Sequence, residues 1–141
     1  MSESARFRTF EEFWPFYVKE HALKATRWMH FAGTTMALGT VAAAVLLRKR
    51  SLFFVAPVMG YGPAWISHFF IEKNRPATFK YPTWSLMADF KMYGMILRGK
   101  MDAEVERVLR EEAERHEAAA PAQERTANGV HGGSDQASAA N

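Results

Sequence analysis

Two long uncharged stretches dominate the pattern of hydrophobic and polar positions along this chain. Residues 28–47 and residues 52–71 each hold 20 residues without a charged side chain. A helix of about 20 apolar residues is long enough to cross the ~30 Å hydrocarbon core of a bilayer. Only Arg48-Lys49-Arg50-Ser51 separates the two stretches. The pattern therefore predicts a helical hairpin that is embedded in a membrane.

Each uncharged stretch also contains residues that shape a helix. In the first stretch, Gly33 with Ala37 and Gly39 with Ala43 have the small-xxx-small spacing that lets two helices approach closely in lipid. Thr26 precedes this stretch and is the expected N-cap of its helix. The second stretch contains prolines and glycines, which predict a kink or a break in its helix. They stand at Pro57, Gly60, Gly62 and Pro63.

Shorter amphipathic segments flank the predicted hairpin. Thr9 and Glu12 have the spacing of a capping box, and the helix that they open carries aromatic residues at helical spacing. Pro15 predicts either a kink in this helix or a later start. A further helix is expected from residue 83 or 85 to about residue 97, either at the membrane interface or packed against the hairpin. The predicted fold is all-α: a small membrane-embedded helical hairpin with flanking amphipathic helices.

Charge divides the chain into two parts. Residues 1–100 hold 14 Lys and Arg against 6 Asp and Glu, a formal +8, whereas residues 101–141 hold 4 against 9, a formal −5. We expect a membrane domain over 1–100, a charged helix over 101–117 and a disordered tail over 118–141. The basic residues flank the apolar stretches without forming a dense patch, so we expect membrane lipid as a partner and no nucleic acid. Their distribution favours cytoplasmic termini.

Three histidines in or beside the apolar stretches are the candidates for chemistry: His21, His30 and His68. A polar ring among apolar helices needs a hydrogen-bond partner or a metal, because an unsatisfied polar group in lipid costs several kcal/mol. One interpretation is a metal site; the alternative is three unrelated histidines, each bonded to a carbonyl group or to water. His21 and His30 would face opposite sides of one straight helix, so they share a metal only if the chain turns between them. A helix cap at Thr26 would supply that turn.

Glu72 is the nearest acidic candidate, because it lies four residues after His68 and shares its helical face. It is interpreted as a ligand, as an acceptor that fixes the His68 tautomer, or as a salt-bridge partner of Lys73 or Arg75. Asp89 is a weaker candidate, for which an ordinary hydrogen bond is expected. Imidazole and carboxylate ligands suit Fe(II), Zn(II), Mn(II) or Cu(II), and the sequence does not choose among them. The chain has no cysteine, which excludes disulfides and thiolate sites, and it has no GxSxG or HExxH motif.

Two segments of the chain carry a resemblance to a known family. The first runs from Phe16 to Thr34 and holds two histidines separated by eight residues. The second runs from Gly60 to Ala77 and holds His68 followed by Glu72-Lys73-Asn74-Arg75-Pro76-Ala77. Separated by an apolar hairpin, the two elements resemble the signature of the Mpo1-like family, also called DUF962. The resemblance covers about residues 10–100.

The resemblance implies an Fe(II)-dependent dioxygenase that shortens 2-hydroxy fatty acids by one carbon. It implies that the three histidines are iron ligands, with Glu72 as a further candidate. Lys73 or Arg75 is then expected to pair with the substrate carboxylate or, alternatively, with lipid phosphate. The expected partners are a 2-hydroxy fatty acid, dioxygen and membrane lipid. The expected location is the endoplasmic reticulum membrane in a eukaryote or the inner membrane in a bacterium.

The chain departs from the characterised family member in two respects. Ala22 follows His21 where that member has a second histidine, and the hairpin is shorter. These differences bear on the identity of the substrate more than on metal binding. Two other classes of protein are alternatives: a non-catalytic membrane scaffold or lipid-binding protein with structural histidines, and a di-iron fatty-acid hydroxylase. The second alternative needs many more histidines than this core contains.

Overall fold

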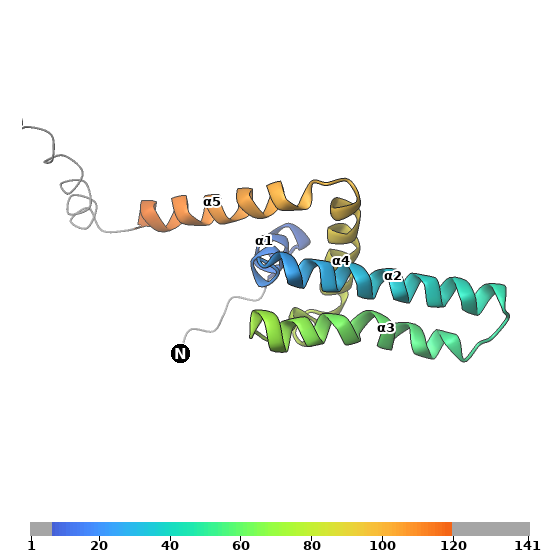
Figure 1. The fold of residues 1–141 in the computed structure, drawn as a ribbon. Helices are drawn as coiled ribbons and strands as arrows, with labels where there is room; N and C mark the ends of the chain where they lie inside the picture. The colour runs from blue at the N-terminus through green and yellow to red at the C-terminus, as the bar shows by residue number, and fades with distance from the viewer. Residues whose placement is uncertain (1–6, 120–141) are drawn as a thin grey trace, which may run out of the picture. The chain divides into compact units, whose positions relative to one another are not determined.

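The computed structural model describes residues 7–119 and, within them, contains helices and no strand (Figure 1). The helices are α1 (Phe10–Glu20), α2 (Lys24–Leu46), α3 (Leu52–Ser67), the π-helix η1 (His68–Glu72), the 3-10 helix η2 (Ala77–Phe79), α4 (Pro82–Leu97) and α5 (Met101–Ala119). The all-α prediction is therefore confirmed. The chain divides into two units between Val108 and Leu109, and the fold described below is that of the first unit. Apart from residues 118 and 119, which end α5, the predicted disordered tail lies outside the described residues.

α1 begins where the capping residues predict. The hydroxyl oxygen of Thr9 accepts a hydrogen bond from the backbone N–H of Glu12 at 3.2 Å. The Glu12 carboxylate accepts in turn from the backbone N–H of Arg8 at 2.9 Å, so both residues satisfy donors at the start of the helix. Pro15 lies inside α1, and a helix start at Pro15 is therefore wrong.

The hydrophobic core of the first unit lies among α1, α4 and the first turns of α5. α1 contributes one aromatic face to it, and α4 contributes Ala88 and Met92. Its buried members are Phe13, Trp14, Tyr17, Val18, Ala77, Tyr81, Ala88, Met92, Met101, Val105 and Val108. This packing holds α1 against α4, which places Tyr17 of α1 beside Asp89 of α4.

α2 and α3 lie side by side and are joined by the short basic connection that the sequence predicts (Figure 1). The two helices approach closely at two glycines: a Cβ atom added to Gly33 would lie 2.6 Å from the carbonyl oxygen of Gly60. Gly33 therefore permits the close contact that its small-xxx-small spacing predicts. Gly39 has no such neighbour, because a Cβ atom there would meet nothing within 4 Å.

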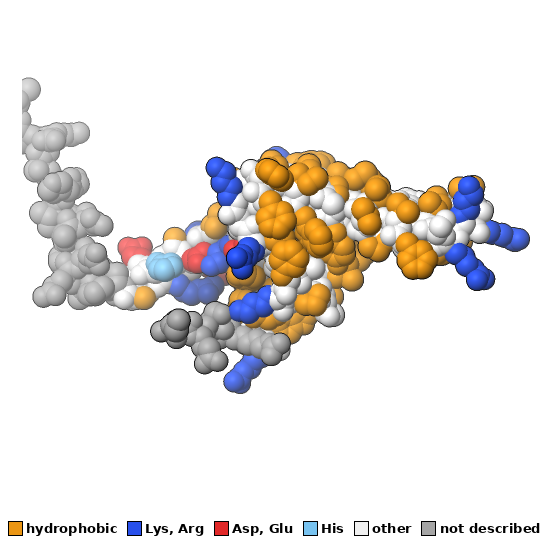
Figure 2. Space-filling model, turned by 90° about the horizontal axis from the view of Figure 1, so that it is seen from below, with side chains coloured by type: hydrophobic (Ala, Val, Ile, Leu, Met, Phe, Trp, Pro, Cys, Tyr) orange, Lys and Arg blue, Asp and Glu red, His pale blue; other side chains and the backbone are white. Residues whose placement is uncertain are grey.

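The α2–α3 pair turns many apolar side chains outward. Leu46 and Phe54 are both 82% exposed, and Figure 2 shows hydrophobic side chains over much of the face that it displays. Among the described residues, α2 is the one helix long and apolar enough to cross a membrane. In the second uncharged stretch, the α-helix runs without a break from Leu52 to Ser67 and includes both prolines, so the predicted break at those residues is wrong. Insertion of the pair into a bilayer stays a prediction.

Candidate metal centre

His21 ends α1 and begins the turn that leads to α2. Its ring is 1% exposed and stacks on the Tyr17 ring, with 4.0 Å between the ring centroids. Its Nδ1 atom lies 2.7 Å from the backbone carbonyl oxygen of Tyr17. A carbonyl oxygen only accepts, so Nδ1 carries the hydrogen and Nε2 carries the lone pair. The sequence makes this contact local, because Tyr17 stands four residues before His21 on the same helix.

Side chains of two later residues, Arg27 and Glu72, hold the turn between His21 and α2. The buried guanidinium of Arg27 donates from Nη1 to the carbonyl oxygens of His21 and Ala22, at 3.0 and 2.5 Å. The Glu72 carboxylate accepts from the backbone N–H of Leu23 at 3.0 Å. Leu23 is the N-cap of α2, so Glu72 satisfies a donor at that helix end.

The chain thus turns between His21 and His30, as a shared site requires, but Thr26 does not cap α2. Thr26 lies inside the helix, and its buried hydroxyl has no hydrogen-bond partner in the described structure. The predicted cap at Thr26 is wrong because α2 begins at Lys24. The backbone N–H of its N-cap, Leu23, donates to the distant Glu72 carboxylate instead.

His30 lies in the second turn of α2 and faces α4. Its Nδ1 atom is 3.0 Å from one carboxylate oxygen of Asp89. The same oxygen accepts a hydrogen bond from the buried hydroxyl of Tyr17. Burial first, and then the Asp89 charge, raise the pKa of Tyr17 well above its ordinary value, so the phenol remains a donor. His30 is therefore held with its hydrogen on Nδ1 and its lone pair on Nε2.

His68 is the first residue of the π-helix η1, and its tautomer is set by Asn74. The Asn74 side-chain oxygen lies 2.7 Å from Nδ1 of His68, and its amide nitrogen donates to the backbone carbonyl and the carboxylate of Glu20. The Glu20 acceptors fix which end of the amide faces His68. The π-helix ends at Glu72, and its C-cap Lys73 has a φ of 57°, which reverses the chain so that the Asn74 N–H donates to the His68 carbonyl oxygen.

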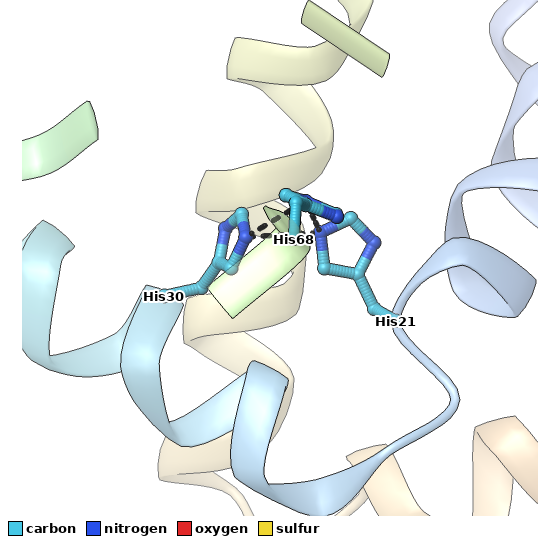
Figure 3. A group of neighbouring side chains, drawn as sticks. All are labelled: His21, His30 and His68. Carbon is cyan, nitrogen blue, oxygen red and sulfur yellow. Dashed lines mark hydrogen bonds between the residues drawn. The ribbon is translucent and has the colours of Figure 1, made fainter. Parts of the chain in front are cut away.

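The three Nε2 atoms converge on one point (Figure 3). Those of His21 and His30 lie 3.1 Å apart, those of His30 and His68 3.2 Å, and those of His21 and His68 3.1 Å. With each ring hydrogen on Nδ1, three lone pairs face one another and no hydrogen lies between them. Such an arrangement is repulsive unless a cation stands among the three nitrogens.

The distances and the burial both fit a metal ion. Three nitrogens about 2.1 Å from one ion, at roughly 90–110° to one another, lie about 3.0–3.4 Å apart. All three rings are buried, and burial lowers the pKa of His21 well below its ordinary value, with His30 and His68 adding to the effect. The neutral ring is the form that binds a metal. Three nitrogen donors without thiolate suit Fe(II), Zn(II), Mn(II) or Cu(II).

The structure thus brings together the three predicted histidines but not the predicted charged residues. Among the described residues, the group that could hold a metal consists of the three histidines without Glu72. Glu72 instead caps α2, and Asn74 takes the role of fixing the His68 tautomer. Lys73 and Arg75 are exposed, and their role in binding a carboxylate stays a prediction.

The sequence analysis gave Tyr17 and Asn74 no role in the site, and for Asp89 it expected an ordinary hydrogen bond without naming His30 or Tyr17 as the partner. A usable signal existed for Asn74, which stands six residues after His68 in a segment that ends a helix. No local signal pairs Asp89 with His30, because the two are 59 residues apart and meet only when α4 packs beside α2.

The fold and the site define a class of protein: an all-helical protein with a buried group of three histidines suited to a metal. The particular family follows from comparison with known families. The chain belongs to the Mpo1-like family, whose model, described as "2-hydroxy-palmitic acid dioxygenase Mpo1-like", matches residues 7–101. No curated protein and no solved structure matches the chain.

Proposed function

We propose that this protein is an Fe(II)-dependent dioxygenase that converts a 2-hydroxy fatty acid into the fatty acid one carbon shorter and CO2. The observation that carries the proposal is the convergence of three buried Nε2 lone pairs within 3.2 Å of one another. The family description, which names 2-hydroxy-palmitic acid, supports the substrate class. His21, His30 and His68 would hold the iron, and the Glu72 carboxylate would cap α2 at Leu23.

The proposed reaction balances without any further reductant. The 2-hydroxy acid and O2 give the shortened acid, CO2 and water: the C1–C2 bond breaks, C2 becomes the new carboxyl carbon and C1 leaves as CO2. The substrate supplies all four electrons that reduce dioxygen. Iron(II), when held by His21, His30 and His68, would supply the unpaired electrons that allow ground-state dioxygen to react with a closed-shell substrate.

The residues of this chain prepare the site in three ways. The acceptors on Nδ1 of each histidine hold the rings in the tautomer that presents Nε2. Burial of the rings keeps bulk water away and strengthens the electrostatic interactions inside. Asp89 carries a negative charge beside His30, which makes that imidazole a stronger donor to a cation.

The proposal also places the protein in a membrane. The exposed apolar side chains of α2 and α3 would face lipid, and the cytoplasmic side would hold both termini. This is the inner membrane in a bacterium and the endoplasmic reticulum membrane in a eukaryote. Lys73 and Arg75, exposed next to Asn74, would meet either the substrate carboxylate or lipid phosphate.

The direct test measures metal content and product together. Full-length protein, purified in detergent and loaded anaerobically with Fe(II), is given O2 and 2-hydroxypalmitate labelled with ¹³C at C1. We expect about one iron per chain, pentadecanoate as the product and ¹³CO2 in equal amount. The His68→Ala variant should lose both the iron and the product.

The matched control is His116→Ala, because His116 lies on α5 outside the group of three histidines. It should keep the iron and the activity of the unaltered protein. Protein that takes up no transition metal would favour the scaffold alternative, and activity that persists in His68→Ala would remove His68 from the site. A product one oxygen heavier than the substrate would indicate a hydroxylase instead.

A further inference from the structure

A cavity of about 330 Å³ opens beside the metal centre and runs between α2 and α3. Its lining on α2 is His30, Thr34, Ala37, Leu38 and Val41. Its lining on α3 is Phe53, Ala56, Pro57, Gly60, Tyr61 and Ala64. Each set recurs at intervals of three and four residues, so each occupies one face of its helix. The cavity therefore follows the seam between the two helices.

The polar groups of this lining gather at one end. The ionisable pair His30 and Asp89 lies there, at the metal centre, and α4 adds Leu86 and Phe90 to the wall. From Leu38 to Val41 on α2 and from Phe53 to Pro57 on α3, the lining residues have apolar side chains. A ligand that fits this lining has one polar end and a long apolar remainder.

The length of the cavity follows from the helices that form it. His30 and Val41 are eleven residues apart on α2, and Ala64 and Phe53 are eleven residues apart on α3. At a rise of 1.5 Å per residue, each wall is about 16 Å long. An extended alkyl chain covers that length with on the order of a dozen methylene groups.

We propose that this cavity holds the alkyl chain of the substrate, with the carboxyl end at His30 and the methyl end near Val41 and Phe53. The proposal rests on the proposed function, and it adds the direction of binding and a preference for long chains. The small side chain of Ala56 leaves space for the distal part of the alkyl chain. Ala56 is 5% exposed and lines the cavity. It lies eight residues, or about 12 Å, beyond Ala64. A larger side chain at Ala56 would block the cavity about three quarters of the way along and leave the part beside the metal open.

The test compares two chain lengths in two variants that carry the same chemical change. Ala56→Leu fills the cavity, whereas Ala42→Leu adds the same atoms at an exposed position of α2 outside the lining. Binding of 2-hydroxyoctanoate and 2-hydroxypalmitate to metal-free protein is measured by displacement of a fluorescent fatty acid. Turnover of both acids is then measured after loading with Fe(II).

Unaltered protein should bind the 16-carbon acid at least tenfold more tightly than the 8-carbon acid, because each buried methylene contributes roughly fourfold. Ala56→Leu should reduce this preference at least tenfold while binding of the 8-carbon acid stays within twofold. Ala42→Leu should behave as the unaltered protein. An unchanged preference in Ala56→Leu, or an equal loss for both acids in protein of unchanged helical content, would overturn the proposal.

A second variant covers the case in which Ala56→Leu does not fold. Phe53 is 47% exposed at the distal end, so Phe53→Ala should fold, lose several-fold in binding of the 16-carbon acid and keep its binding of the 8-carbon acid. No selective loss in this variant would also contradict the proposal. Selective binding without turnover in the unaltered, iron-loaded protein would contradict the proposed function and leave the cavity assignment supported.

Discussion

Asp89 and His30 are joined across 59 residues of sequence by a 3.0 Å contact between a carboxylate oxygen and Nδ1. The same oxygen accepts the hydroxyl hydrogen of Tyr17, whose ring stacks on His21. Asp89 thereby orients one histidine directly and a second through Tyr17. One carboxylate of α4 therefore contacts His30 and also the residue on which His21 stacks.

Removal of the Asp89 carboxylate should weaken metal binding without removing a ligand. In Asp89→Ala, we expect metal affinity to fall about 10–100-fold, because His30 loses the acceptor that fixes its tautomer. Tyr17→Phe should have a smaller effect, since the ring stack on His21 is kept. Affinity is measured with Co(II), by competition against a chelator, and the visible spectrum of the bound ion reports the geometry.

Tyr93→Phe is the matched control for Tyr17→Phe. Tyr93 stacks on Phe31 and contacts the hydroxyl of Thr35, and it does not touch the three histidines. Its variant should bind Co(II) as the unaltered protein does. Equal affinities for Asp89→Ala and the unaltered protein would show that the carboxylate does not position His30.

Asn74 should prove as important to His68 as Asp89 is to His30. Asn74→Leu removes the acceptor that faces Nδ1, so the ring hydrogen can move to Nε2, and we expect metal affinity to fall at least tenfold. Asn74→Asp keeps an oxygen at that place but puts a second carboxylate beside Glu20. Its metal affinity should therefore lie between that of the unaltered protein and that of Asn74→Leu. Nitrogen NMR of the histidine rings in metal-free protein measures the tautomer directly. A His68 ring that keeps its hydrogen on Nδ1 in Asn74→Leu would rule out this role.

Much of the fold was predictable because its causes are local. The uncharged stretches predict α2 and α3, and the spacing of Thr9 and Glu12 predicts the start of α1. The start of α2 was not predictable, because Glu72, 49 residues away, satisfies the donor at Leu23. The π-helix at His68 has no sequence signature that we could identify, and it supplies the reversal that returns Asn74 to His68.

The sequence made it possible to predict the three candidate metal ligands, but not the residues that form hydrogen bonds to their rings. A histidine in an apolar segment is visible because a polar ring there requires a partner. The partners of His30 and His68 are an aspartate and an asparagine, and such residues are common at helix ends and surfaces. Their roles depend on which helices pack together, and the sequence carries that information only through the whole fold.

The acid sensitivity of the fold should depend on Glu104. Arg107 donates to its carboxylate at 2.6 and 3.0 Å, and Trp14 donates at 2.7 Å. These donors lower the pKa of Glu104 from 4.5 to about 2. The unfolded chain therefore binds the proton at a higher pH than the folded chain, so the stabilisation is complete above about pH 4.5 and is lost as the pH falls toward 2.

Glu104→Gln should lower the free energy of unfolding by about 1–2 kcal/mol at neutral pH, because hydrogen bonds to a charged acceptor are replaced by neutral ones. The difference in thermal midpoint between this variant and the unaltered protein should shrink between pH 4.5 and pH 2. Glu106→Gln, at an exposed position of the same helix, is the control and should show no such trend. A difference that stays constant over this pH range would contradict the assignment.

The contact between Gly33 and Gly60 links the packing of the helix pair to the geometry of the metal centre. Gly33 lies one turn after His30, and Gly60 lies on the helix that leads to His68. In Gly33→Ala, the new Cβ atom would stand 2.6 Å from a backbone oxygen, so α2 and α3 must move apart. We expect a loss of about 1–3 kcal/mol in stability and weaker metal binding, because separating the helices separates His30 from His68.

Gly39→Ala provides a control of the same chemistry on the same helix. No atom lies within 4 Å of the added Cβ atom, so the substitution should be neutral or stabilise the helix by up to about 1 kcal/mol. Thermal unfolding in detergent and Co(II) affinity are measured for both variants. If the two alanines changed both quantities alike, the close approach at Gly33 would not be what sets the distance between His30 and His68. If only Gly33→Ala lost affinity, the spacing of two helices would be shown to control the convergence of the histidines.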